Sequence, residues 1–248
     1  MENVSGHALQ ISRSGKGGPT VVFEHGLGSD LTVWTKVQQQ LLGGLSTFAY
    51  SRPGFGESEL IKGSRSPLEV AKALYDTLRE LGVPGPFLLV GHSSGGLYVR
   101  MFASLYPEEV LGLVLVDPSH ERQAREIMGD DPGSLAKLSE IPSDTSEPIR
   151  RELSGLIPVL SSGILLVDGK VPDVPMVVLT STAIPAGAKD FDKTISKIRR
   201  LHDELLFSSS DSMHVVTAHC RHFIQVDRPD LVAEAIRWVA SEAEKYKR

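Results

Sequence analysis

The fold of this chain is decided by one stretch of sequence, Phe87-Leu88-Leu89-Val90-Gly91-His92-Ser93-Ser94-Gly95. Its first four residues are an uninterrupted apolar run, which is typical of a strand buried on both faces. The last five match the pattern G-x-S-x-G, and the helical pattern of Leu97–Phe102 follows them. A strand, a tight turn and a helix in this order predict a strained turn whose small neighbours let the Ser93 hydroxyl point into open space.

Short apolar runs alternate with longer helical patterns over the rest of the chain. One predicted helix begins at Ser66-Pro67-Leu68-Glu69, which combines a capping serine, proline at the first helical position and glutamate at the third. Another begins at Asp227-Arg228-Pro229. The alternation predicts an α/β fold with a mostly parallel, doubly wound sheet and helices on both faces. The strands are expected at Ala8–Ser12, Thr20–Glu24, Thr47–Tyr50, Phe87–Val90, Leu111–Val116, Pro175–Leu179 and Met213–Ala218.

One stretch, between Pro118 and Asp173, interrupts this alternation and contains no convincing strand. It carries helical pieces at Glu121–Met128 and Glu147–Leu156, and its apolar content argues against disorder. A loop of this length inside a compact domain is usually functional. We therefore expect a core domain formed by residues 1–117 and 174–248, with residues 118–173 as a helical cap or lid insertion over the sheet edge where ligands bind.

The composition is that of an ordinary globular chain, with 248 residues and a formal net charge of −5. Hydrophobic residues make up 41% of it, enough for a sizeable core. No apolar run approaches the ~18 residues that span a bilayer. The polar start of the chain lacks the apolar segment of a signal peptide, and no block of Lys or Arg indicates a nucleic-acid or membrane surface. We expect a soluble, cytoplasmic protein.

The same reading gives no sign of a metal or a bound cofactor. Cys220 is the only cysteine, which excludes a disulfide framework and a cysteine-rich metal site within one chain. Asp130-Asp131 and the scattered histidines lack the spacing of metal ligands. Gly15-Lys16-Gly17-Gly18 lacks the second half of a phosphate-binding loop. We therefore expect neither a metal nor a cofactor.

A second glycine-rich turn, His25-Gly26-Leu27-Gly28, follows the predicted strand Thr20–Glu24. Such a loop at the carboxyl end of a strand can aim backbone amides at a developing oxyanion. We expect the Leu27 amide to pair there with the amide of Ser94, the residue after the nucleophile Ser93. The His25 side chain is expected to hydrogen-bond within the loop rather than to act in catalysis.

Four segments in sequence order resemble the α/β-hydrolase fold family, in particular its single-domain, esterase-like serine hydrolases with a short helical cap. The resemblance extends along nearly the whole chain and rests on Val22–Gly28, Tyr50–Ser58, Gly91–Gly95 and His222–Pro229. It implies a triad in the chain order nucleophile, acid, histidine, with the histidine on the loop after the last strand. It also implies that Ser51–Ser58 is a structural loop without a catalytic role.

Three histidines lie near the position that the family gives to the base. His214 falls inside the predicted strand Met213–Ala218, where the sheet would hold it, and His219 follows that strand directly. His222 lies deeper in the loop and matches the family's pattern of histidine, an aromatic or aliphatic residue, isoleucine and glutamine. We expect His222 to be the general base and keep His219 as the alternative.

Two strand ends offer candidates for the acid of the triad. In the family it usually follows the strand Pro175–Leu179, but here no carboxylate appears before Asp190 and Asp192. A minority of members place the acid one strand earlier, and Asp117 stands directly at the end of Leu111–Val116. A carboxylate there can reach the imidazole and hold its tautomer. We expect Asp117 to be the acid, with Asp190 or Asp192 as the alternative.

Together these residues predict a serine hydrolase that cleaves a carboxylic ester or a similar small acyl substrate through an acyl-enzyme. One alternative is a non-enzymatic or very slow small-molecule receptor on the same fold. Another is different chemistry on the same triad, such as C–C hydrolysis, perhydrolysis or lyase activity. Ser93 excludes haloalkane dehalogenases and epoxide hydrolases, which need aspartate at this turn. The expected partner is a small-molecule substrate, not a nucleic acid or membrane, and no oligomeric state is predicted.

Overall fold

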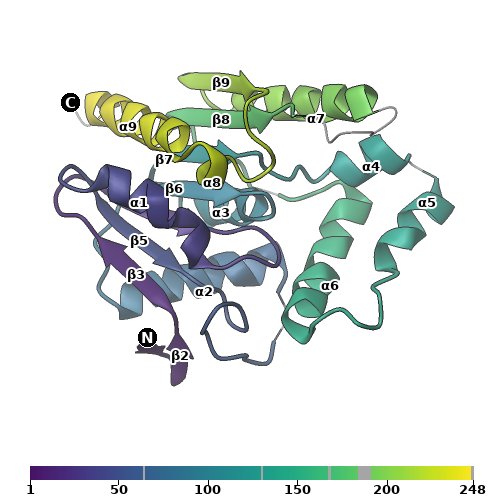
Figure 1. The fold of residues 1–248 in the computed structure, drawn as a ribbon, viewed down its shortest axis with the longest axis horizontal. Coiled ribbons are helices and arrows are strands. Elements are labelled where there is room, and N and C mark those ends of the chain that lie inside the picture. The colour runs from purple at the N-terminus through teal and green to yellow at the C-terminus, as the bar shows by residue number, and fades with distance from the viewer. Residues whose placement is uncertain (64, 130, 167–168, 184–190, 247–248) are drawn as a thin grey trace.

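A seven-stranded sheet runs through the centre of the molecule, as the computed structural model of the chain shows (Figure 1). The structure describes residues 1–248 except 64, 130, 167–168, 184–190 and 247–248. The strands are β1 (Glu2–Val4), β2 (His7–Leu9), β3 (Ile11–Ser14), β4 (Thr20–Glu24), β5 (Ser46–Tyr50), β6 (Phe87–His92), β7 (Val110–Val116), β8 (Met176–Ser181) and β9 (Ser212–Thr217).

The order of strands across the sheet is β3-β5-β4-β6-β7-β8-β9. Only β3 runs antiparallel to its neighbour, and every other pair is parallel. Strands β1 and β2 form a separate antiparallel hairpin. The mostly parallel, doubly wound sheet predicted from the sequence is confirmed.

Helices cover both faces of this sheet. One hydrophobic core is built around Trp34, Leu41 and Ile236, and it packs α1 and α9 against one face. The other is built around Leu74 and Phe102, and it packs α2 and α3 against the opposite face. The helices are α1 (Thr35–Leu41), α2 (Pro67–Glu80), α3 (Gly95–Leu105), α4 (Gln123–Met128), α5 (Pro132–Ala136), α6 (Glu147–Ser162), α7 (Phe191–Leu205), α8 (Ile224–Asp227) and α9 (Pro229–Tyr246). Strands buried by helices on both faces need no polar alternation, as the sequence of β6 predicts.

Helices α4, α5 and α6 connect β7 to β8 and lie beyond the carboxyl ends of the parallel strands (Figure 1). Leu156 of α6 packs with Leu97 and Tyr98 of α3 in a small hydrophobic cluster. This is the stretch for which the sequence predicts helices and no strand, and the described residues between Pro118 and Asp173 contain no strand. The division of the chain into a core and a cap stays a prediction.

Two predicted elements differ most from the structure in extent, while the bounds of several others shift by one or two residues. The expected strand Ala8–Ser12 is divided into β2 and β3, because the backbone of Gln10 bonds to the Ser58 hydroxyl and the Ser51 amide instead of a neighbouring strand. The helix expected at Glu147–Leu156 continues as α6 through Pro158 and ends at Gly163, which adopts a left-handed φ of 71°. Such a glycine is a common helix terminator.

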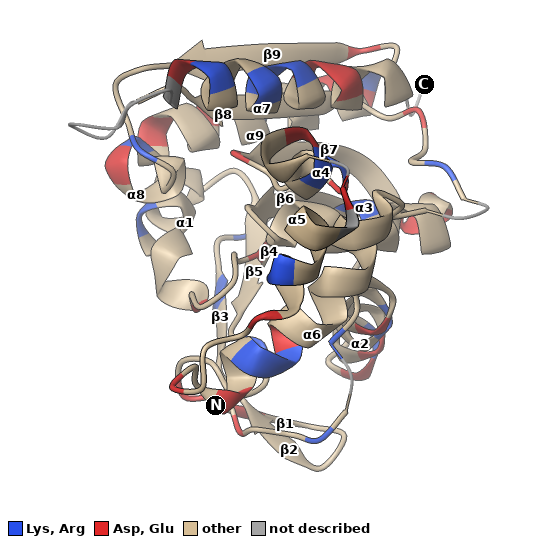
Figure 2. Cartoon of the chain, turned by 90° about the vertical axis from the view of Figure 1, so that its right-hand side faces the viewer, with Lys and Arg blue, Asp and Glu red and all other residues tan. Residues whose placement is uncertain are grey.

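Charged residues of both signs alternate along α7 and α6 in Figure 2, which looks at the side of the molecule where the helices after β7 lie. No helix in the described part of the chain is long and apolar enough to cross a membrane.

We expect Leu78→Ala to lower the free energy of unfolding by about 2–5 kcal/mol, because Leu78 of α2 is fully buried and its loss leaves a cavity. Urea denaturation followed by circular dichroism measures the change. Leu68→Ala on the same helix is the matched control, since Leu68 is 40% exposed and its truncation should cost far less. Equal losses in the two variants would contradict the placement of α2 on the sheet.

Candidate active site

Ser93 occupies a strained turn between β6 and α3. Its φ is 52°, in the left-handed region that non-glycine residues rarely adopt. The glycines on either side of Ser93 are required because neighbouring backbone atoms leave no room for a Cβ atom. A Cβ atom on Gly95 would lie 2.3 Å from the Glu24 carbonyl oxygen, and one on Gly91 would lie 2.6 Å from the Gly95 carbonyl oxygen. The structure therefore has the strand, sharp turn and helix that the sequence predicts around Ser93.

Asp117 stands at the end of β7, the strand next to β6 in the sheet, and it also has a left-handed φ, of 42°. Its Oδ2 atom accepts a hydrogen bond of 2.7 Å from His222 Nδ1. Its Oδ1 atom accepts one of 3.0 Å from the backbone amide of Ser181, at the end of β8. A carboxylate on Nδ1 fixes the imidazole tautomer that leaves Nε2 free to accept a proton.

His92 connects the loop that carries His222 to the turn that carries Ser93. The His92 and His222 rings lie 4.6 Å apart between centroids, and His92 Nε2 donates a 3.0 Å hydrogen bond to the carbonyl oxygen of His222. In the described part of the chain, no hydrogen bond joins the Ser93 hydroxyl to the His222 ring. Catalytic hydrogen bonds are often long until substrate binds. The structure thus brings His222 to Asp117 and holds its backbone beside Ser93.

The turn after β4 lies against Ser93, as expected for an oxyanion loop. A Cβ atom on Gly26 would lie only 3.1 Å from Ser93 Cβ. Within the described residues, neither the Leu27 amide nor the Ser94 amide donates a hydrogen bond, so both remain available to an oxygen atom of a substrate. His25 is buried and bonds within the loop, with Nδ1 2.8 Å from the Gly26 carbonyl oxygen. The hydrogen bond within the loop that was expected for His25 is confirmed.

The structure also places the alternatives that the sequence left open. His214 lies in β9, and its ring bonds to Thr180 and Asp203 rather than facing Ser93. His219 is exposed on the loop after β9. Asp192 is exposed on α7, and Asp190 lies outside the described residues. The predicted roles of Ser93, Asp117, His222, Leu27 and Ser94 in catalysis stay predictions.

A buried ionic network behind the oxyanion loop was not predicted from the sequence. Arg52 forms a bidentate pair with Glu152 of α6, at 2.5 Å and 2.9 Å, and a second ion pair with Glu24 at the end of β4. The three side chains are at most 1% exposed. Arg52 also donates hydrogen bonds to the carbonyl oxygens of His25 and Gly26. One guanidinium therefore ties the oxyanion loop, the sheet and α6 together.

The charges of this network set the protonation of its neighbours. Burial raises the pKa of Glu24, while Arg52 and a 2.6 Å hydrogen bond from the Tyr50 hydroxyl oppose that rise. Burial and the Arg52 charge hold the pKa of His25 well below its usual value. His25 is therefore neutral, with Nε2 free to accept a 3.1 Å hydrogen bond from the Arg52 amide. The neutral ring locks the oxyanion loop to the loop after β5.

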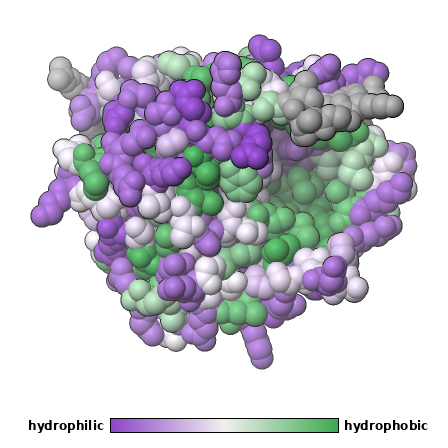
Figure 3. All heavy atoms as spheres, viewed as in Figure 1, coloured by the Kyte–Doolittle hydropathy of each residue, from purple (hydrophilic) through white to green (hydrophobic). Residues whose placement is uncertain are grey.

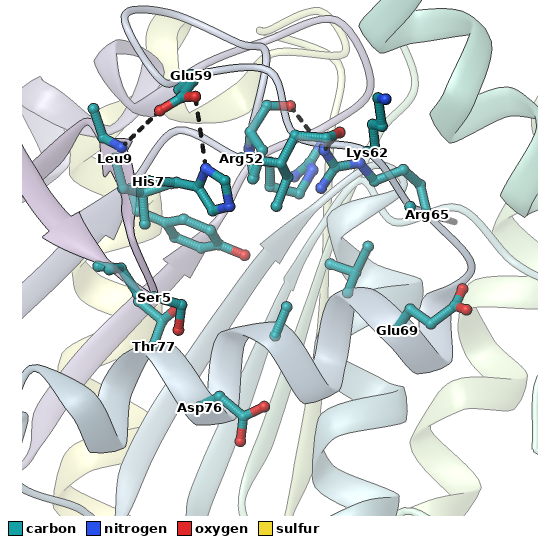
Figure 4. A pocket seen from close by; sticks show the side chains of 18 residues that line it. Ser5, His7, Leu9, Arg52, Glu59, Lys62, Arg65, Glu69, Asp76 and Thr77 are labelled. Carbon is teal, nitrogen blue, oxygen red and sulfur yellow. Dashed lines mark hydrogen bonds and ion pairs between the residues drawn. The ribbon is translucent and has the colours of Figure 1, made fainter.

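Two recesses differ in their relation to this site. A cavity of about 380 Å³ lies between the β1–β2 hairpin, the loop after β5 and α2 (Figure 4). Arg52, Arg65 and Lys62 line it with His7 and Glu59, and none of the triad candidates is among its lining residues. The face seen in Figure 3 is instead hollowed on the side where α5 and α6 lie, and much of that hollow is apolar. Pro148 and Ile149 of α6 approach Gly54 and Gly28 at this side.

No group of three or more His, Cys, Asp or Glu side chains in the described part of the chain is arranged to hold a metal ion. Cys220 is buried in the loop before His222, and burial raises the pKa of its thiol.

Comparisons with known proteins identify the fold. Residues 19–140 match the family model for the alpha/beta hydrolase fold. The chain is 26% identical over 232 residues to the uncharacterized protein YqjL of Bacillus subtilis, covering 90% of this chain and 84% of that protein. It is 35% identical over 141 residues to esterase Rv0045c of Mycobacterium tuberculosis, covering 56% of this chain and 46% of the esterase. The chain thus spans less than half the length of that esterase.

Solved structures share the whole fold. A thermophilic esterase from Thermogutta terrifontis superposes with a TM-score of 0.62 at 20% identity, covering 96% of this chain and 94% of that one. The serine hydrolase CarC, involved in carbazole degradation, superposes with a TM-score of 0.67 at 20% identity, covering 96% of both chains. The chain has the α/β-hydrolase fold. It is a hydrolase, as the sequence predicts.

We expect Arg52→Met to destabilise the protein by about 3–5 kcal/mol at pH 7.5, because it leaves Glu24 and Glu152 buried without their cation. The loss should shrink at pH 5.5, where a buried and unpaired carboxyl can take up a proton instead of remaining charged. Urea denaturation at both pH values tests this. Arg151→Met, which removes a more exposed pair with Glu147, should cost less than about 1 kcal/mol. Similar costs for the two variants would contradict a central role for the network.

Acid should destabilise the fold through buried histidines. Burial lowers the pKa of His92 to about 3 and that of His120 to about 4. Below pH ~6.5 the unfolded chain therefore binds protons at these histidines that the folded chain does not bind. The free energy of unfolding consequently falls as the pH falls. Each histidine should remove roughly 2 kcal/mol between pH 7.5 and pH 5. His120→Gln should flatten this dependence by about one proton, whereas the same change at exposed His219 should not. An unchanged slope in His120→Gln would disprove the assignment.

Proposed function

We propose that this α/β-hydrolase cleaves a carboxylic ester, or a similar small acyl substrate, through an acyl-enzyme on Ser93. The observation that carries the proposal is the 2.7 Å bond between Asp117 and His222, on a loop whose backbone His92 holds beside Ser93. The left-handed φ of Ser93 supports it, because strain of this kind persists where function requires the geometry. The name of the Mycobacterium relative, an esterase, supports the same reaction class.

In the first half-reaction, the Ser93 hydroxyl oxygen attacks the carbonyl carbon while His222 Nε2 takes its proton. Asp117 accepts the hydrogen bond from Nδ1 and stabilises the imidazolium that forms. The carbonyl oxygen becomes an oxyanion within reach of the Leu27 and Ser94 amides. His222 then gives its proton to the alkoxy oxygen, the carbon–oxygen bond of the ester breaks, and the alcohol leaves.

In the second half-reaction, His222 takes a proton from a water molecule that attacks the acyl-enzyme carbonyl. A second oxyanion forms at the same two amides and collapses, breaking the bond to the Ser93 oxygen. Ser93 recovers its proton from His222, and the carboxylic acid leaves. One ester and one water thus give one alcohol and one acid, with the enzyme unchanged.

We assign residues 118–173 the role of a cap over this site. The α6 helix is fixed to the core through Glu152, and Ile149 lies near Gly28 of the oxyanion loop. The apolar hollow on the same side favours an apolar acyl group, since burial of apolar surface is the main source of binding energy for such groups (Figure 3).

We expect Asp117→Asn to lower kcat for p-nitrophenyl esters by about 10⁴-fold, because the wrong tautomer of His222 would face Ser93. Ser93→Ala should abolish turnover, and an organophosphonate should label the native protein once, at Ser93, as measured by mass spectrometry. Asp192→Asn is the matched control and should stay within about twofold of the native rate. Asp192 also represents the alternative acid, so a large loss there and a small one in Asp117→Asn would reverse the assignment.

A binding protein on the same fold would behave differently. It would form no acyl-enzyme with any ester or lactone of a broad panel, and Ser93→Ala would leave its ligand affinity intact. Full ester turnover by Ser93→Ala would refute the proposed nucleophile.

A further inference from the structure

A continuous chain of hydrogen bonds runs from the surface to the backbone beside Asp117. Asp203 Oδ1 lies 2.6 Å from His214 Nδ1, and His214 Nε2 lies 2.7 Å from the Thr180 hydroxyl oxygen. The same hydroxyl lies 2.7 Å from His202 Nδ1, and His202 Nε2 lies 2.7 Å from the carbonyl oxygen of Pro118. Thr180 and His202 are at most 1% exposed, while Asp203 is half exposed on α7. The proposed reaction uses none of the four side chains.

The hydrogen bonds from Asp203 to Pro118 need more protons than the neutral groups between them supply. Four hydrogen bonds need four protons. The Thr180 hydroxyl supplies one and each neutral imidazole supplies one, which makes three. Carbonyl and carboxylate oxygens at the two ends can only accept. All four hydrogen bonds can therefore form only when these groups carry one additional proton.

The location of that proton follows from the two ends. Burial lowers the pKa of His202, which makes its ring the neutral one. Its single proton must be on Nε2, because Pro118 offers only a carbonyl oxygen. His202 Nδ1 then accepts from the Thr180 hydroxyl, which in turn accepts from His214 Nε2. His214 must also donate from Nδ1 to Asp203, so His214 carries both protons beside a carboxylate.

The inner end of the chain lies where the triad acid is held. Pro118 directly follows Asp117, whose left-handed φ needs support from its surroundings. Thr180 lies between Leu179, whose carbonyl oxygen accepts from the Asp117 amide at 2.8 Å, and Ser181, whose amide donates to Asp117 Oδ1. The Ser181 hydroxyl also donates a 2.5 Å bond to the Cys220 carbonyl oxygen, two residues before His222. The end of β8 therefore holds both the acid and the loop of the base.

We propose that His202 and His214, joined by Thr180, are positioning residues that hold Asp117 toward His222, with His214 as an imidazolium paired to Asp203. The part of this proposal that concerns turnover rests on the proposed function. The titratable groups that face the chain are Asp203 on α7, Asp117 at the end of β7 and His120 in the segment after β7. Without the additional proton, His214 can bond to Asp203 or to Thr180 but not to both, which weakens the support of Thr180 at the end of β8.

The protonation pattern is tested by nitrogen-15 NMR of histidine-labelled native protein at pH 7.5, which needs no substrate. We expect both nitrogens of His214 to be protonated and His202 to be protonated on Nε2 alone. A singly protonated His214, or a proton on Nδ1 of a neutral His202, would overturn the proposal. Asp203→Asn, a surface change, should remove the second proton of His214 in the same spectra. A doubly protonated His214 in that variant would count against the pairing.

The effect on the triad is tested by a matched series at Thr180. Thr180→Val keeps the shape but removes the hydroxyl, and kcat for p-nitrophenyl esters should fall by about tenfold or more with KM nearly unchanged, because small displacements at a triad are costly. Thr180→Ser restores the hydroxyl and should recover most of the rate. Thr182→Val, which removes a 3.2 Å bond to the Thr217 carbonyl oxygen, is the control outside the chain.

The outcomes separate this proposal from the proposed function. If the native protein hydrolyses no ester, the proposed function fails, while the NMR pattern still decides the hydrogen-bond chain. If Thr180→Val retains native kcat and a native pH profile, the positioning role is wrong even when the ester activity is real. If Thr180→Val does not fold, Asp203→Asn gives the same comparison, with an expected fall in kcat and a nearly unchanged KM.

Discussion

The ion pairs of Arg52 with Glu24 and Glu152 join the sheet to the α6 helix behind the candidate active site. The guanidinium joins the end of β4 and the loop that follows it to α6, which lies far from both in the sequence. Two carboxylates around one buried cation leave an excess of negative charge. Burial raises the pKa of Glu24, which favours the uncharged form of that carboxyl. Arg65, which is also buried, contributes further positive charge to the same surroundings. The oxyanion loop is thus fixed from behind rather than by contacts at the reaction side.

Two of the three described non-glycine residues with a left-handed φ stand at neighbouring strand ends, and the third is Ser5 in the β1–β2 turn. Ser93 and Asp117 are both non-glycine residues with left-handed φ, and they follow strands β6 and β7, which lie side by side. Such conformations persist only where the surroundings hold them. Bonds from the Ser93 amide to the Val116 carbonyl oxygen and from the Ser119 amide to the Ser93 carbonyl oxygen link the two turns directly. Each strained turn therefore supports the other, and both depend on the rigid sheet beneath them.

Most of the fold could be predicted from the sequence, as could the positions of Ser93, Asp117 and His222 after their strands, because both follow from local patterns. Unbroken apolar runs mark the parallel strands, and a Gly-Ser turn or an aspartate at a strand end is visible without knowing any contact. The Arg52–Glu152 pair was not visible, since 100 residues separate its partners and each alone resembles a surface charge. Likewise, His214 could be placed in a strand, but its link through Thr180 to His202 depends on how α7 packs. The extent of β2 and β3 was missed because the backbone of Gln10 bonds to a loop instead of a strand.

The position of Asp117 has a consequence for how this enzyme can diversify. In the proposed triad the acid comes from the end of β7, so the end of β8 acts only as a support, through Thr180 and Ser181. A supporting residue can be replaced by any other that keeps its hydrogen bonds, whereas a catalytic acid must keep its charge. Evolution, or a protein engineer, could therefore vary the end of β8 more freely than the end of β7 while the rate of the chemical step is preserved.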